Sequence, residues 1–194
     1  DNAGFTAATS LIAASTTRLY QTPAGQGTSP MANTGSKTVL DTNLNTAGIV
    51  PLGRKFSCLE FGIQVVAGTG TGENGVTNGT RITDYNDAWN VLKGVHVVYQ
   101  LPSETIPLGP AWMWPAGGGP SGAAFTTANA TSVGVGTNGV AAASARKKFY
   151  TKVLLEPGMD FRVELVIENA ISTNQASVRF VVYVVQYGVW LKPL

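Results

Sequence analysis

The sequence is poor in the residues that build most catalytic and metal sites: it contains one cysteine, Cys58, and one histidine, His96. A single cysteine cannot form a disulfide within the chain, so packing has to hold the fold together. A zinc site of cysteine and histidine needs three or four such ligands, and only two are present. A nucleophile activated by histidine would have His96 as its only base. We therefore expect no enzyme activity, no metal and no other cofactor.

Charge is scarce as well, with 13 Lys and Arg against 11 Asp and Glu and a net charge of +2. This net charge is too small to indicate a dedicated nucleic-acid-binding protein.

A pair of carboxylates also fails to indicate a glycosidase. Glu164 and Glu168 would share one strand face about 13 Å apart. That separation is wider than the roughly 5–9.5 Å between the two carboxylates of a glycosidase. No run approaches the roughly 18 consecutive apolar residues that a membrane-spanning helix needs.

What the chain has instead is a large apolar share, 44%, together with 23 glycines in 194 residues. This length suits one domain with a core of its own, and the apolar content argues against a disordered chain. His96 is expected on the less apolar face of a strand, and Cys58 is expected to be an unreactive, half-buried thiol.

Several segments alternate apolar with polar residues, the period of two that predicts β-strands with one buried face. We expect strands over residues 58–65, 95–101, 149–155, 161–167 and 178–191, with shorter ones near 37–40 and 105–114. Glu156, Pro157 and Gly158 predict a type II turn that closes 149–155 and 161–167 into a hairpin. Both faces of 178–191 are apolar, which predicts a central strand or one covered by another subunit.

The remaining chain predicts one helix, an arm and two long loops. The helix is expected within residues 84–93, with Asp84 as its cap and Gly94 as its stop. We divide the chain into an N-terminal arm, 1–35, and a single domain, 36–194, whose long loops cover 67–81 and 115–145. The expected fold class is all-β, an antiparallel β-sandwich of jelly-roll type with this one short helix.

Four features carry a resemblance to a known family: the neutral arm of small residues, the Thr/Gly/Asn-rich loops, the aromatic-started segments 149–155 and 161–167 joined by Glu-Pro-Gly, and an apolar last strand ending at Trp190 and Leu191. In these features the chain resembles viral single jelly-roll capsid proteins. Arg18 is the only arginine or lysine in residues 1–35, whereas arms that package RNA carry many basic residues to neutralise phosphates. The resemblance is therefore to the capsid proteins of icosahedral DNA viruses and phages.

This resemblance implies a structural protein of the virion that assembles with copies of itself, and with other capsid proteins, into an icosahedral shell. The basic run Arg146, Lys147 and Lys148 would contact an internal membrane or the genome, and no small-molecule substrate is expected. The arm, the loops and the sheet faces would mediate assembly. The expected assembly contacts are Phe5, Leu11, Ile12, Trp112, Trp114, Phe125, Tyr183 and Tyr187.

A second function class stays open: a carbohydrate-binding β-sandwich, or the tip of a viral spike or adhesin. Trp112 and Trp114 would point to the same side of an extended segment and could stack on sugar rings. Tyr85 and Trp89 are further candidates for such stacking. The two classes differ in assembly, because a capsid protein forms defined oligomers or shells and a binding module stays monomeric.

Overall fold

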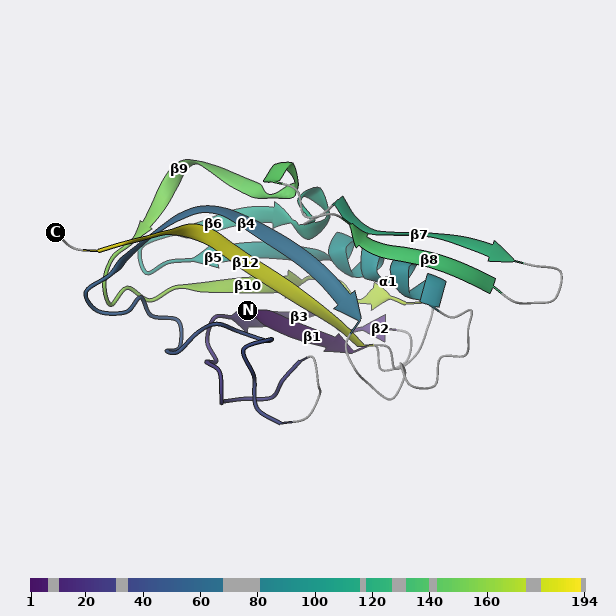
Figure 1. The fold of residues 1–194 in the computed structure, drawn as a ribbon, viewed down its shortest axis with the longest axis horizontal. Helices are drawn as coiled ribbons and strands as arrows, with labels where there is room; N and C mark the ends of the chain where they lie inside the picture. The colour runs from purple at the N-terminus through teal and green to yellow at the C-terminus, as the bar shows by residue number, and fades with distance from the viewer. Residues whose placement is uncertain are drawn as a thin grey trace.

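The computed structural model describes residues 1–6, 11–30, 35–67, 81–115, 118–126, 132–139, 143–173 and 179–192. The chain forms mostly antiparallel β-sheets, with two four-stranded sheets packed as a sandwich (Figure 1). The first sheet has the strand order β1 (Asn2–Thr6), β12 (Arg179–Leu191), β4 (Lys55–Ala67), β9 (Lys147–Leu155). The second has the order β3 (Ser15–Leu19), β10 (Arg162–Ile167), β5 (Val95–Gln100), β6 (Thr105–Pro110).

Smaller elements lie beside the two sheets. They are the paired strands β2 (Leu11–Ile12) and β11 (Ile171–Ser172), the paired strands β7 (Gly118–Thr126) and β8 (Ser132–Gly139), the helix α1 (Arg81–Gly94), and the 3₁₀ turns η1 (Ala111–Met113) and η2 (Ala143–Ala145). α1 packs against β7 and η1 (Figure 1). No helix among the described residues is long and apolar enough to cross a membrane.

The core lies between the two sheets because alternate residues of each strand point inward. Phe61 of β4 meets Tyr99 of β5 edge to face across the sandwich, with ring centroids 5.1 Å apart. Val163 and Leu165 of β10 are fully buried, as is Ile63 of β4. The structure therefore confirms the expected class, an antiparallel β-sandwich, and α1 is the expected α-helix.

The predicted hairpin of residues 149–155 and 161–167 is wrong. The turn itself forms, since the N–H of Met159 donates to the carbonyl of Glu156 at 3.0 Å and Gly158 has a φ of 75°. However, β9 pairs with β4 and β10 pairs with β3 and β5, so the turn carries the chain from one sheet to the other. On each side of this turn, a large apolar residue enters the core. Because the core lies between the two sheets, both residues can be buried when their strands belong to opposite sheets.

Two local predictions also need correction. Residues 37–40 form a turn and not a strand, because the N–H groups of Asp41 and Thr42 both donate to the carbonyl of Thr38. α1 begins at Arg81, three residues before the expected cap, so Asp84 lies inside the helix and Gly94 is its last residue. A side chain at Gly94 would come within 2.5 Å of Ile171, and this close packing explains the glycine.

The segments set apart in the sequence as an arm and loops contain strands. Residues 1–35 contribute β1 to the first sheet and β3 to the second, and Phe5 and Leu19 reach the core. Residues 115–145 include β7 and β8, which pair with each other. Most of the expected loop 67–81 lies outside the described residues.

Candidate functional site

A cavity of about 330 Å³ opens beside β12, near the point where β1 starts. Its walls are mostly apolar, and buried core residues form its floor. Its lining residues are Asp1, Tyr20, Val39, Leu40, Asp41, Thr42, Asn43, Leu44, Val50, Phe56, Leu155, Phe161, Tyr183, Val185, Gln186 and Trp190. A cavity of this size with a few polar groups at one end is the usual form of a binding site.

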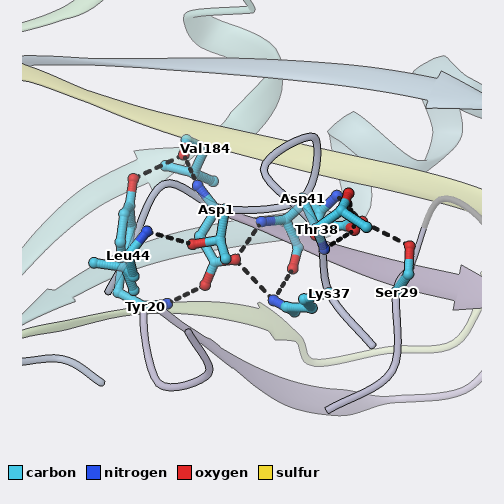
Figure 2. A network of polar contacts seen from close by, with 10 residues as sticks. Asp1, Tyr20, Ser29, Lys37, Thr38, Asp41, Leu44 and Val184 are labelled. Carbon is cyan, nitrogen blue, oxygen red and sulfur yellow. Dashed lines mark hydrogen bonds and ion pairs between the residues drawn. The ribbon is translucent and has the colours of Figure 1, made fainter. Parts of the chain in front are cut away.

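Asp1, one of the residues that line this cavity, forms a buried ion pair with Lys37 (Figure 2). The ammonium of Lys37 lies 2.7 Å from the Asp1 carboxylate, and the Asp1 side chain is only 1% exposed. The same ammonium donates to the carbonyl of Asn2 at 3.2 Å. Burial lowers the pKa of Lys37, and the nearby Asp41 carboxylate acts in the opposite direction. The pair fixes the segment around Lys37 against the first residues of β1.

Asp41 holds the turn that forms one wall of the cavity (Figure 2). One of its carboxylate oxygens accepts hydrogen bonds from Asn2 Nδ2 at 3.1 Å and from Ser29 Oγ at 3.0 Å. The other oxygen accepts from the backbone N–H of Thr38 at 2.9 Å and from its hydroxyl at 3.2 Å. Because Asp41 is 1% exposed, these bonds replace the water that a carboxylate otherwise needs.

Tyr20 closes the cavity on the side of the second sheet. It follows β3 with a φ of 64°, a conformation that is uncommon for residues other than glycine. This backbone conformation accompanies a hydrogen bond from its N–H to the Asp1 carboxylate. Its ring packs on Phe161 at 5.7 Å, and its hydroxyl donates to the carbonyl of Val184 at 2.7 Å. Full burial raises the pKa of Tyr20, so its hydroxyl stays protonated in neutral solution.

The eight residues expected at assembly contacts do not form one site. Phe5, Ile12 and Trp114 are buried within the chain, whereas Leu11 is 46% exposed and Trp112 is 48% exposed. The Trp114 indole N–H is buried with no hydrogen-bond partner among the described residues. Their role in assembly stays a prediction.

The other three expected contacts lie on strands. Phe125 belongs to β7 and pairs with Val133, and its side chain lies outside the described residues. Tyr183 and Tyr187 are half-buried on β12, and Tyr183 is the one that lines the cavity. The cavity therefore includes one of the eight expected residues.

The expectation that Trp112 and Trp114 project to the same side is wrong. Their segment is the 3₁₀ turn η1 rather than an extended strand, so Trp112 faces solvent and Trp114 the core. Of the other proposed stacking residues, Trp89 is partly buried against the core. The side chain of Tyr85 lies outside the described residues.

The three residues of the basic run have different surroundings. Arg146 is engaged within the chain, since it pairs with Glu60 and lies 4.0 Å above the ring of Tyr187. Lys147 is half-buried and Lys148 is exposed on β9. A contact of this run with a membrane or genome stays a prediction.

The single histidine and the single cysteine lie in different sheets and do not form a shared site. His96 is exposed on β5, on the less apolar face as expected. Cys58 is fully buried rather than half-buried, and burial raises the pKa of its thiol to about 11. Among the described residues, no group of three or more His, Cys, Asp and Glu side chains could hold a metal ion.

Sequence reasoning did not single out the residues at the polar end of the cavity. One signal was present: Thr38 stands three residues before Asp41, the spacing of a capping box, in which an acidic side chain accepts from the backbone N–H three residues earlier. The pairing of Lys37 with Asp1 depends on residues 36 positions apart and has no local signature. Comparison with protein-family models, characterised proteins and solved structures finds no match to this chain.

Proposed function

We propose that this protein is a non-catalytic structural protein of a virus capsid, with a jelly-roll fold, whose copies assemble into an icosahedral shell of the virion. The observation that carries the proposal is the strand order of the two sheets. Numbering the strands of these two sheets one to eight along the chain gives 1-8-3-6 for the first and 2-7-4-5 for the second.

This order supports the jelly roll because of how such a fold is built. A jelly roll arises when an antiparallel ribbon of the pairs 1-8, 2-7, 3-6 and 4-5 rolls into two sheets. Each of those pairs is a hydrogen-bonded neighbour here: β1 with β12, β3 with β10, β4 with β9, and β5 with β6. Jelly rolls also occur in lectins and cupins, so the fold does not decide the function by itself.

Exposed apolar residues on the first sheet favour assembly over an isolated module. Val185, Val189 and Leu191 of β12 and Leu154 of β9 are each between 41% and 51% exposed. An apolar patch on a sheet is typical of a surface that another protein covers. The alternative, a carbohydrate-binding module, loses one argument because Trp112 is exposed without Trp114 beside it.

Electron microscopy of the purified full chain, together with light scattering after size exclusion, tests the proposal. We expect shells or oligomers of defined size at neutral pH. A protein that stays monomeric at high concentration and is retained by an immobilised glycan would contradict the capsid function and favour the binding module.

A further inference from the structure

β9, the outermost strand of the first sheet, bulges away from its neighbour β4 in the middle of its length. Its pairing with β4 is interrupted between Val153 and Lys148, where residues 149–152 of β9 lie against the single residue Leu59. Figure 1 shows the sharp bend of β9. A bulge of this kind redirects the side chains that it carries.

The bulge presents a polar ridge with one aromatic ring. Phe149 and Val153 are partly buried and pack against the core, so both ends of the bulge are anchored. The side chains between and beside them lie in solvent. We call the exposed residues of this segment the β9 ridge: Lys148, Tyr150, Thr151 and Lys152.

The lysines of β9 carry positive charge that the chain does not neutralise. Among the described residues, no carboxylate forms an ion pair with any of them. The two carboxylates beside the strand have other partners, since Glu60 pairs with Arg146 and Glu156 pairs with Lys55. A local excess of positive charge therefore stands on β9, although the net charge of the whole chain is only +2. Such an excess attracts anions.

Protection of the sheet edge explains the lysines of the β9 ridge but not its tyrosine. Lysine side chains and a bulge both prevent an edge strand from pairing with another chain. An aromatic ring contributes nothing to that protection. Yet Tyr150 is more exposed than any other large apolar residue that the structure describes. A ring held in solvent between two lysines is suited to a partner that offers both anions and a flat face.

We propose that the β9 ridge, together with Lys147 on the same strand, binds single-stranded nucleic acid. Tyr150 stacks on an unpaired base, and the lysines contact the phosphates on either side of it. A positively charged track with aromatic side chains for stacking is how proteins bind single strands without sequence preference. The inference deepens the proposed function, on which it rests, by naming the partner of these basic residues.

The β9 ridge has too little apolar surface to favour a membrane instead. A segment that lies in a bilayer interface binds with a strength that scales with the apolar area it buries. Tyr150 is the only large apolar side chain on the ridge. The apolar residues beside it, Phe149 and Val153, pack against the core and are not available to insert.

The salt dependence of binding tests the contacts to phosphate. Fluorescence anisotropy of a labelled oligothymidylate, titrated with the full chain, measures the binding constant. Because each neutralised phosphate of a single strand contributes about 0.7 to the slope of log K against log salt, the three lysines predict a slope of about −2.

Two variants that each lose one exposed lysine locate these contacts. Lys152→Ala should weaken binding at low salt and make the slope shallower by about 0.7. Lys93→Ala, the same loss of charge from α1, is the matched control and should leave the slope unchanged. Equal slopes for Lys152→Ala and the parent protein would overturn the assignment of the phosphate contacts.

Substitutions at Tyr150 test the stacked base. Tyr150→Leu keeps an apolar side chain without a ring and should weaken binding about fivefold or more, whereas Tyr150→Phe keeps the ring and should bind like the parent protein. Circular dichroism should show both variants folded, because the side chain is exposed. Equal binding by Tyr150→Leu and Tyr150→Phe would refute stacking.

Other polyanions identify the partner class. A DNA duplex of the same length, heparin, and vesicles of phosphatidylserine and phosphatidylcholine in equal parts are the probes. We expect the single strand to bind more tightly than the duplex, because only unpaired bases are free to stack. Vesicles or heparin that bind more tightly than the single strand, with no effect of Tyr150→Leu, would contradict the proposal.

Electron microscopy beside these titrations separates this inference from the proposed function. Binding of the single strand by a protein that forms no shells would contradict the capsid function and support the β9 ridge as a binding site. Shells formed by a protein that binds no oligothymidylate would contradict the site and support the capsid function.

Discussion

The hydroxyl of Tyr20 donates a hydrogen bond to the carbonyl of Val184 at 2.7 Å and thereby connects the two sheets of the sandwich. Tyr20 follows β3 of the second sheet, and Val184 lies in β12 of the first. The bond forms at the point where β1 ends its pairing with β12, so a side chain replaces a strand there.

Tyr20→Phe should destabilise the fold by about 1 kcal/mol, because it removes a buried hydrogen bond to the carbonyl of Val184, which keeps its bond from the nitrogen of Asp1. Urea unfolding followed by fluorescence measures the change. Tyr150→Phe is the matched control, since Tyr150 is fully exposed and should shift the midpoint very little. Equal midpoints for the two variants would mean that the Tyr20 hydroxyl contributes nothing to stability.

Asp41→Ala should cost about 3 kcal/mol or more of unfolding free energy. The substitution leaves the buried Asn2 amide, the Ser29 hydroxyl and the Thr38 N–H without their acceptor. Glu168→Ala, at an exposed carboxylate, is the control and should stay close to the parent protein. A small effect at Asp41 would show that water replaces the carboxylate in this turn.

Cys58 should react slowly with iodoacetamide. Its thiol pKa is about 11 instead of 9.0, which lowers the thiolate fraction about a hundredfold at pH 8. Burial reduces the rate further, so mass spectrometry should show labelling only after denaturation. Fast labelling of the native protein would show that the strand around Cys58 opens readily.

The same pKa shift predicts a loss of stability in alkaline solution. Below pH 9 the thiol is protonated in both the folded and unfolded states, so its contribution is complete. Between about pH 9 and 11 the unfolded state releases the proton first, and the free energy of unfolding falls as pH rises. Cys58→Ala should reduce this slope, as measured by urea unfolding at a series of pH values. An unchanged slope would assign the loss to other groups.

Deleting residues 1–35 should abolish cooperative unfolding rather than leave a folded core. The deletion removes β1 and β3 together with the buried Phe5, Leu19 and Tyr20, and so exposes one edge of each sheet. Thermal melts by circular dichroism, with the full chain as reference, measure the effect. A sharp transition in the truncated protein would instead support the division of the chain into an arm, 1–35, and a domain, 36–194.

The local pattern was enough to predict the long strands but not their neighbours. The period of two in residues 58–65 and 161–167 reflects burial of one face, which any sandwich requires, and β4 and β10 form there. The Glu156–Gly158 turn was also predictable, because proline and glycine fix its backbone angles. Which strands pair across such a turn depends on competition among all the strand edges of the chain, and no short segment contains that information.

The residues around the cavity show the same difference between what local patterns predict and what the folded chain decides. The sequence by itself determined that the chain has too few histidines and cysteines for a Cys/His zinc site, and that its last strand is apolar on both faces. Only the tertiary structure decided that Asp1, Tyr20, Lys37 and Asp41 meet beside that strand. The physical reason is range: alternation and turn chemistry act between residues a few positions apart, whereas burial, ion pairing and strand pairing join groups that only the folded chain brings together.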